Sequence, residues 1–324
     1  MLLEVKNLSV EFLSDEPGQA PAHAVDSVSF SLNRGEVLGL VGESGCGKSA
    51  TAMSIPRLLP SPPARITSGE IFFQGENLLS LPIERMREIR GTKIGVIFQD
   101  PMTSLSPLHR IGDQLIEVVR LHRNLSRSAC RDLALEWLGR VGIPDPEQRA
   151  KAFPFELSGG MQQRVMIAMG LILEPELIIA DEPTTALDVT IQAQILNLMR
   201  KLYRQNSALL LITHDMGVVY QMATKITVMY AGQVVESCED AARFFAHPQH
   251  PYSRALLEAL PSAETRGQKL RAIPGQVPYA GAFPPGCRFH DRCPQARPAC
   301  SSAEQTLHPV NDSLVRCPFT ETSK

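Results

Sequence analysis

The sequence contains no apolar run approaching the roughly 18 to 20 residues that a membrane-crossing helix needs. Its first residues, MLLEVKNLSVEF, lack the basic stretch and apolar core of a secretory signal peptide. Neither sign of charge is in excess, because the formal net charge is only -2, which argues against a general nucleic-acid-binding surface. These absences predict a protein that is made and kept in the cytosol, where disulfides are disfavoured.

The 324 residues are 44% hydrophobic, which is enough for a sizeable core and suggests two domains. Two N-terminal segments alternate apolar and polar residues and predict antiparallel strands at 2–13 and 23–32. Short apolar runs farther along are typical of buried parallel strands, with helical patterns at about 111–121, 127–141 and 160–173. Strands that alternate with helices predict an α/β fold with a largely parallel sheet. The parallel strands are expected at 36–42, 93–99, 176–182 and 208–214.

A glycine-rich segment, GESGCGKS, follows an apolar strand pattern and precedes a helical one. This is the context in which G-x-x-x-x-G-K-[ST] forms a phosphate loop, with backbone N–H groups and a helix N-terminus facing the anion. Lys48 is expected to reach the β- and γ-phosphates, and the Ser49 hydroxyl to hold Mg²⁺. The alternative is a chance glycine-rich turn. The expected ATP-binding residues of this segment are Gly42, Glu43, Ser44, Gly45, Cys46, Gly47, Lys48, Ser49 and Ala50.

Cys46 lies inside this loop. A helix N-terminus lowers the pKa of a thiol, so one hypothesis is a reactive cysteine. The alternative is a small residue that the loop merely tolerates.

A second acidic segment, ELIIADEP, places Asp181 and Glu182 at the end of an apolar run. A buried strand that ends in carboxylates delivers them to the carboxyl edge of a parallel sheet, where ligands bind. Asp181 is expected to complete the Mg²⁺ shell, and Glu182 to act as general base on the attacking water. The alternative is a pair of helix-capping carboxylates ahead of Pro183.

The segment LSGGMQQRVMIAMG begins at Leu157 and predicts a second anion-binding helix start, with Ser158 as N-cap. With this segment the chain resembles the ATPase subunits of ABC transporters, whose signature is LSGGQ; Met161 stands at its fifth position. The resemblance implies a RecA-like parallel sheet core, an antiparallel β subdomain and a helical subdomain. It also implies that Leu157, Ser158, Gly159, Gly160 and Met161 contact ATP bound by a partner subunit.

The resemblance assigns further roles that the residues alone would not. Gln99 is implied as the Q-loop glutamine that senses the γ-phosphate and Mg²⁺, Ala186–Asp188 as the D-loop, and His214 as the switch histidine that positions the water. Phe12 falls where an aromatic ring stacks on adenine. Taken singly, a glutamine after a strand is usually a polar cap, and a histidine at a strand end is usually a structural hydrogen-bonding group. The implied magnesium set is Ser49, Gln99 and Asp181.

The family implies a mechanism in which two ATPase subunits stack head to tail. ATP lies between the phosphate loop of one subunit and the signature helix of the other, and ATP binding favours the closed state. No motif here is degenerate, so the chain is expected to give an active half to each of two composite sites.

After about residue 245 the sequence resembles the C-terminal extension of dipeptide and oligopeptide importer ATPases, through HPQHPYSRALLEALPS. We therefore expect a nucleotide-binding domain at 1–245, with a helical subdomain at about 101–160, and an extension at 246–324. The branch implies a paralogous second ATPase subunit, two transmembrane permeases, an extracytoplasmic binding protein and a peripheral place on the cytoplasmic face of the membrane. Nickel chelates or other small ligands are the alternative cargo.

Four of the seven cysteines lie near the end, with gaps of five, six and sixteen residues between them. Four thiolates suit tetrahedral zinc or an iron–sulfur cluster. The tight C-x₂₋₄-C pairs typical of zinc are missing, and some peptide importers carry such a tail around a [4Fe–4S] cluster. Zinc and free thiols remain alternatives. The expected ligands are Cys287, Cys293, Cys300 and Cys317, and the arginines that could offset their charge are Arg288, Arg292, Arg297 and Arg316.

Two other functions are less consistent with the sequence. A non-transport ABC ATPase typically carries two cassettes, long coiled coils or inserted zinc modules, and this chain has one cassette without such an insertion. A nucleotide sensor without turnover is disfavoured because Glu182 and His214 are intact. The leading hypothesis is an ATPase that powers peptide import.

Overall fold

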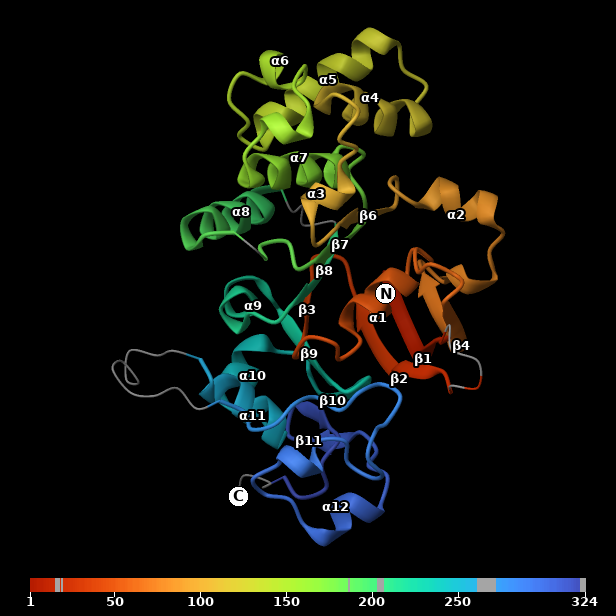
Figure 1. Ribbon diagram of the computed structural model, residues 1–324, viewed down its shortest axis with the longest axis vertical. Coiled ribbons are helices and arrows are strands. Elements are labelled where there is room, and N and C mark those ends of the chain that lie inside the picture. Colours follow the sequence, from red (N-terminus) through yellow and green to blue (C-terminus); the bar gives the residue numbers. More distant parts are fainter. Residues whose placement is uncertain (15–17, 19, 186, 203–206, 261–271, 321–324) are drawn as a thin grey trace. The chain divides into compact units, whose positions relative to one another are not determined.

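The computed structural model describes residues 1–14, 18, 20–185, 187–202, 207–260 and 272–320. By its contacts the chain divides into two compact units. The first joins Met1–Ser80 to Leu211–Lys324, and the second is Leu81–Leu210. The red N-terminal strands and the cyan and blue C-terminal ribbon of Figure 1 therefore belong to one unit. The boundary falls inside strand β8 (Ala208–Thr213).

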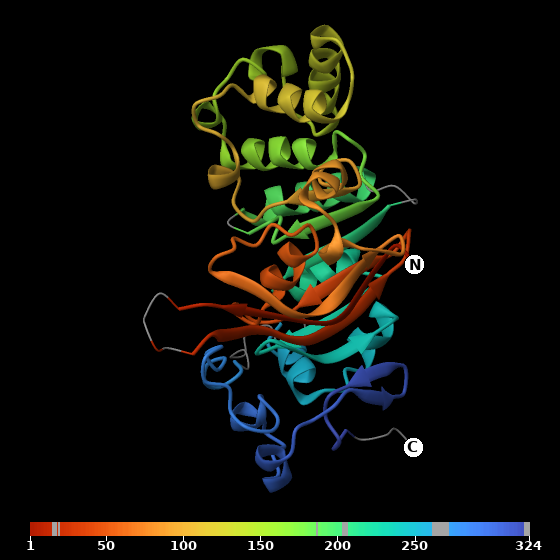
Figure 2. The ribbon, with the colours of Figure 1, turned by 90° about the vertical axis from the view of Figure 1, so that its right-hand side faces the viewer.

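An antiparallel sheet opens the first unit, as the alternating pattern predicts. Strands β1 (Leu3–Phe12) and β2 (Ala22–Leu32) pair antiparallel, and β1 also pairs with β4 (Ala64–Phe73). The strand order is β2-β1-β4-β5, where β5 is Glu76–Asn77. Figure 2 shows the long red and orange strands of this sheet side by side. The predicted antiparallel strands are confirmed, with ends that differ by one residue at most.

The second sheet has eight strands among the described residues, and its part in the first unit contains the buried strand β3 (Val37–Val41), which pairs in parallel with β9 (Lys225–Tyr230). Beyond β9 the sheet continues through antiparallel β10 (Gln233–Cys238), β12 (Ser313–Val315) and β11 (His308–Val310). Every residue of β3 and β9 is buried, which is why β3 reads as a continuous apolar run, whereas β9 also carries the polar Lys225 and Thr227.

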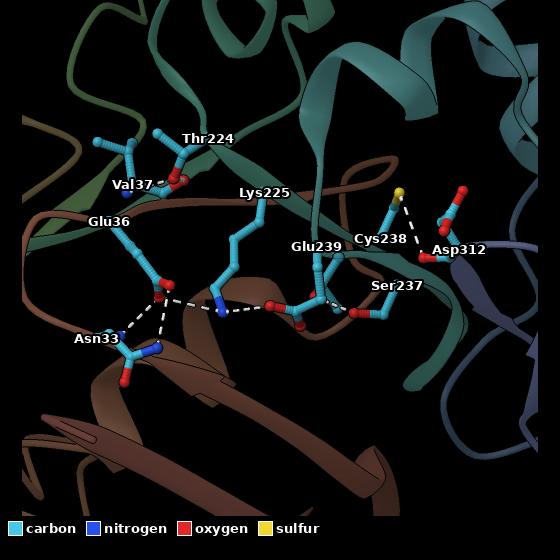
Figure 3. Close-up of polar contacts among 10 residues, drawn as sticks. Asn33, Glu36, Val37, Thr224, Lys225, Ser237, Cys238, Glu239 and Asp312 are labelled. Atoms are coloured by element: carbon cyan, nitrogen blue, oxygen red, sulfur yellow. Dashed lines mark hydrogen bonds and ion pairs between the residues drawn. The ribbon is translucent and has the colours of Figure 1, made fainter.

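A buried lysine at the start of β9, Lys225, pairs with Glu36, which directly precedes β3 (Figure 3). The Lys225 ammonium is 3% exposed, with Glu36 Oε2 at 3.1 Å and Glu239 Oε2 at 2.8 Å. Burial alone would raise the pKa of Glu36, but hydrogen bonds from Asn33 and Lys225 lower it overall. Val37 N–H donates to Thr224 Oγ1 at 2.9 Å beside this pair. The buried Lys225 charge is thus paired with two carboxylates that are more exposed than it is.

The C-terminal extension packs on the same sheet through aromatic side chains. Helix α11 (Pro251–Glu258) confirms the helical segment framed by prolines. Helix α10 (Ala241–Ala246) precedes that segment, and α12 (Pro298–Ser302) follows a 3₁₀ turn, η3 (His290–Arg292). The rings of Tyr230, Tyr252 and Phe289 contact one another with centroids 4.6 to 5.2 Å apart. All three are at most 1% exposed, so the extension shares a core with β9.

His250 caps α11, where its Nδ1 accepts the Tyr252 N–H at 3.0 Å. Complete burial lowers the pKa of His250 to about 3; the Arg316 backbone acts in the opposite direction, and the charges of Arg316 and Arg254 lower it further. The nearby Glu236 carboxylate accepts the His250 N–H at 2.7 Å, and burial raises the pKa of Glu236. The imidazole is therefore neutral in the folded protein at neutral pH.

We predict that this histidine contributes to acid sensitivity. The unfolded chain binds a proton at His250 more readily, so the stabilisation is present above about pH 6.5 and is lost as the pH falls towards 3. Between pH 7 and pH 5 the expected loss is about 2 kcal/mol of unfolding free energy. Urea titrations of the wild type and His250→Asn, which keeps a capping acceptor without titrating, measure it. If the unfolding free energy of both proteins changed with pH by the same amount, the prediction would be contradicted. Glu236 is present in both proteins, so its own titration does not affect the comparison.

The second unit holds β6 (Ile94–Ile97) and β7 (Leu177–Asp181), which pair in parallel, together with helices. The three long predicted helices are confirmed to within two residues at each end. Among the residues that the structure describes, no helix has both the length and the apolar character needed to cross a membrane. The helices are α2 (Ile83–Ile89), α3 (Pro101–Ser104), α4 (Ile111–His122), α5 (Arg127–Arg140), α6 (Pro146–Arg149), α7 (Gly159–Leu171) and α8 (Val189–Leu202).

Candidate active site

The glycine-rich segment forms a loop between β3 and α1 (Lys48–Ser54) in the first unit. Gly42, Gly45 and Gly47 all have positive φ, at 151°, 79° and 100°. At Gly42 a Cβ atom would lie 2.2 Å from the carbonyl oxygen of Met229, so the loop passes too close to the neighbouring strand for a side chain. The sequence therefore needs glycine here both for conformation and for space.

Lys48 is 5% exposed and lies under the loop. Its Nζ donates to the carbonyl oxygens of Gly42 at 2.7 Å and Glu43 at 2.9 Å. The loop is closed further by Cys46 N–H donating to Glu43 O at 3.3 Å, and it is tied to the sheet by Gly232 N–H donating to Cys46 O at 3.0 Å. The ammonium thus lies against the carbonyls that begin the loop, where it is at hand for a phosphate group bound there.

Cys46 is fully buried, and burial raises its pKa, which outweighs the lowering by Lys48. The structure therefore favours the inert alternative over a reactive thiol. We expect iodoacetamide at neutral pH to modify Cys46 at least about tenfold more slowly than a free cysteine. Mass spectrometry of the Cys46 peptide, with and without denaturant, measures this. Rapid labelling of the folded protein would contradict the prediction.

In the second unit the parallel register of β6 and β7 brings Gln99 and Glu182 to the same sheet edge. Gln99 Nε2 donates to Glu182 Oε2 at 3.0 Å, and Thr185 Oγ1 donates to the same oxygen at 2.8 Å. Glu182 has a positive φ of 45°, which is unusual outside glycine. Two donors and a constrained backbone therefore fix the carboxylate, while Asp181 lies buried at the end of β7.

The signature segment begins α7 as predicted. Ser158 is the N-cap, and its Oγ accepts the Met161 N–H at 3.4 Å. Gln162 Nε2 donates to the Pro154 and Leu157 carbonyls, and Gln163 Nε2 donates to Pro183 O at 2.6 Å. The last contact joins the signature helix to the turn that carries Glu182. Sequence reasoning missed Thr185 and Gln163; the spacing of Thr185 three residues after Glu182, typical of a turn, was the only available signal.

The other candidate residues have individual positions. Phe12 ends β1, and Asp188 Oδ1 accepts the Ile191 N–H at 2.9 Å at the start of α8. His214 is exposed and follows β8, just before α9 (Met216–Met222). Ala186 of the expected D-loop lies outside the described residues. The phosphate loop and His214 belong to the first unit, and Gln99, Glu182 and the signature helix belong to the second.

The expected magnesium donors are a hydroxyl, an amide and a carboxylate, at Ser49, Gln99 and Asp181. Oxygen donors of this kind suit Mg²⁺, which keeps several of its own waters and takes few protein ligands. The donor set therefore fits the metal chemically.

The four C-terminal cysteines lie in the extension as free thiols. Burial raises the pKa of Cys287 to about 11, and the nearby thiols of Cys300, Cys317 and Cys293 add to the rise. The thiols therefore lie within electrostatic range of one another. Within the described part of the chain, however, no group of three or more His, Cys, Asp or Glu side chains is arranged to hold a metal ion.

The arginines beside these cysteines have other partners. Arg288 donates to the Asp26 carboxylate and to the Ala231 carbonyl. Arg316 donates to the Val234 and Gln305 carbonyls, at 2.8 and 2.7 Å, and Arg297 lies over the ring of Phe319. Arg292 pairs with Glu43 of the phosphate loop. Three of these side chains thus attach the extension to the rest of the first unit.

Comparison with known proteins agrees with these features. A model of the ABC transporter family matches residues 25–185, and one of the oligopeptide/dipeptide transporter C-terminal region matches residues 235–300. The chain is 47% identical to the dipeptide transport ATP-binding protein DppD of Escherichia coli over 96% of this chain and 94% of that protein. It is 48% identical to DppD of Bacillus subtilis, over 92% and 88%. The solved dimer of the ATP-binding cassette MJ0796 with ADP and phosphate matches with a TM-score of 0.63 and 29% identity, over 72% of this chain and 96% of that one.

Proposed function

The chain belongs to the ATP-binding subunits of ABC transporters, and from this premise we propose that it hydrolyses ATP to drive uptake of dipeptides or short oligopeptides. The observation that carries the proposal is that one chain holds both a complete ATPase motif set and an extension matched by the oligopeptide/dipeptide transporter region at 235–300. Relatives that span nearly the whole chain are named for dipeptide transport. Nickel chelates or another small ligand remain the alternative cargo.

In the proposed reaction Lys48 and the loop amides hold the phosphates of ATP, and Phe12 contacts the adenine. Ser49, Gln99 and Asp181 hold Mg²⁺, which neutralises phosphate charge when bound. Glu182 accepts the proton of the attacking water at a carboxylate oxygen, and His214 positions that water. The contact between Gln99 and Glu182 supports this assignment, because it joins the residue proposed to sense nucleotide to the proposed base.

The complete site is proposed to need a second ATPase subunit. Leu157, Ser158, Gly159, Gly160 and Met161 contact ATP held by the partner, with Asp188 at the same interface. The two glycines that begin α7 support this, because their backbone N–H groups can face an anion. A paralogous ATPase, two permeases and an extracytoplasmic binding protein complete the proposed importer, which places this chain on the cytoplasmic face of the membrane. Residues 1–245 act as the ATPase domain in this proposal, and 246–324 as the extension.

The test is reconstitution with the co-purified permeases and partner ATPase in proteoliposomes that enclose nucleotide. Dipeptide added outside with the binding protein is expected to raise ATP hydrolysis several-fold. Labelled peptide is expected to accumulate inside the vesicles, where the nucleotide is. A nickel chelate at the same concentration serves as the matched ligand control. If only the nickel chelate stimulated ATP hydrolysis, the cargo would be the chelate and not peptide. ATP hydrolysis that never depends on the permeases would contradict a transport role.

We also propose that Cys287, Cys293, Cys300 and Cys317 hold a [4Fe–4S] cluster. The support is the resemblance to peptide importers that carry one and the mutual proximity of the thiols. Binding requires the side chains to turn from their described positions and release their protons. Protein purified anaerobically is expected to contain about four iron and four sulfide per chain and to absorb broadly near roughly 400 nm. Colourless protein with one zinc, or with no metal, would contradict the proposal.

A further inference from the structure

We propose that the C-terminal extension holds the phosphate loop in its binding conformation through Arg292 and Tyr252, which both contact Glu43. Arg292 and Tyr252 are thus positioning residues, and ATP affinity depends on them although neither touches nucleotide. This inference rests on the proposed function only in that the loop binds ATP. It gives the extension a role in the ATPase site itself.

Glu43 is the second residue of the phosphate loop and is held at three places. Its carboxylate receives two hydrogen bonds from the Arg292 guanidinium, Nη1 to Oε2 at 2.8 Å and Nη2 to Oε1 at 3.0 Å. Its backbone N–H donates to the Tyr252 hydroxyl at 3.0 Å. Its carbonyl accepts from Lys48 Nζ at 2.9 Å. Two of these three contacts come from the extension, and the third comes from the lysine that is proposed to bind phosphate.

Arg292 is itself rigidly placed. It is 7% exposed, and its Nε donates to Pro274 O at 2.7 Å while Nη1 also reaches the Tyr230 hydroxyl at 3.2 Å. Burial alone would lower the pKa of Arg292, but its hydrogen bonds with Glu43 and Tyr230 raise it overall. A bidentate, largely buried pair of this kind fixes direction as well as distance. The guanidinium therefore determines where the Glu43 carboxylate lies.

Tyr252 is equally fixed, because it is fully buried against Tyr230 and Phe289. Burial and the nearby Glu43 raise the pKa of Tyr252, so the phenol stays protonated. Its hydroxyl accepts the Glu43 N–H, so the extension holds the backbone at the start of the loop. Loss of either contact frees the first turn of the loop, and ATP binding must then order it again.

The experiment measures ATP affinity and turnover separately for Arg292→Ala in the full chain. Equilibrium binding of a fluorescent ATP analogue is expected to weaken about 10- to 100-fold, since 1.4 kcal/mol corresponds to tenfold. The rate at saturating ATP is expected to change less than about threefold, because no transition-state contact is lost. Arg292→Lys keeps the positive charge but not the two-pronged guanidinium. Its ATP affinity should lie between those of the wild type and Arg292→Ala.

Arg316→Ala is the matched control. Arg316 also lies in the extension and also precedes a cysteine, but its guanidinium donates to the Val234 and Gln305 carbonyls and its backbone N–H to Val235 O, none of which belongs to the loop. Its loss is expected to lower the melting temperature without changing ATP affinity. If both alanine variants weaken binding alike, the effect is a general loosening, and the proposal is overturned. Unchanged affinity in Arg292→Ala overturns it as well.

Two further variants keep the test decisive if Arg292→Ala does not fold. Tyr252→Phe removes only the hydroxyl and keeps the ring packing, and is expected to weaken binding about 3- to 10-fold. The double variant Glu43→Arg with Arg292→Glu exchanges the two charges. It should recover part of the ATP affinity that either single substitution loses. The positioning role would be excluded if Tyr252→Phe lost no ATP affinity and the double variant recovered none. Failure of the wild type to bind ATP would instead remove the proposed function.

Discussion

Replacing Glu182 with glutamine is expected to slow ATP hydrolysis by about 10²- to 10⁴-fold while ATP binding stays within a few-fold of the wild type. The carboxylate is assigned the proton of the attacking water, and an amide of the same shape cannot accept it. The amide oxygen can still accept from Gln99 and Thr185, so the local geometry is expected to survive. Phosphate release at saturating ATP and equilibrium binding of an ATP analogue measure the two effects separately.

Thr185→Val provides the graded control for this experiment. It removes one of the two hydrogen bonds to Glu182 and leaves the carboxylate itself in place. A general base that is less well oriented but intact should cost about 3- to 10-fold in turnover. Hydrolysis at the wild-type rate in Glu182→Gln would contradict the assigned role. An equal loss in both variants would show that position, and not proton transfer, is the contribution of this residue.

The local parts of the site follow from short sequence patterns. The glycines of the phosphate loop, the carboxylates that end β7 and the serine that caps α7 each depend on neighbours within a few residues. Such patterns place a residue on an element, and parallel strands then bring their carboxyl ends to one edge. This is why Gln99 and Glu182 can meet although they are 83 positions apart; the sequence predicted the two strands but not the contact itself.

The contacts of the extension do not follow in this way. Arg292 and Glu43 are 249 positions apart, and no periodicity relates a 3₁₀ turn in a cysteine-rich segment to a loop near the N-terminus. The sequence placed Arg288, Arg292 and Arg316 beside cysteines and suggested charge compensation. In the fold they contact Asp26, Glu43 and backbone carbonyls. Adjacent side chains in an irregular segment point in different directions, so sequence proximity says little about which groups meet.

Replacing Gly47 with alanine is expected to weaken ATP binding by more than about 100-fold, whereas Gly45→Ala should weaken it by less than about tenfold. Both glycines have positive φ, at 100° and 79°, so either alanine adds backbone strain of about 1 to 2 kcal/mol. Only Gly47 is also crowded. A Cβ there would lie 2.3 Å from Ala24 O, while at Gly45 nothing lies within 4 Å.

The overlap at Gly47 involves a backbone oxygen of β2, which cannot rotate away as a side-chain terminus could. The loop must therefore leave its position beside β2, and with it the start of α1 and Lys48. Overpacking of this kind costs typically about 1 to 3 kcal/mol beyond the strain, and the cost falls on the conformation that binds ATP. Equilibrium binding of an ATP analogue, with thermal melting as the measure of folding, separates the two variants. Equal losses of ATP affinity in the two variants would show that the loss comes from the positive φ alone. The close approach of the loop to β2 would then contribute nothing to it.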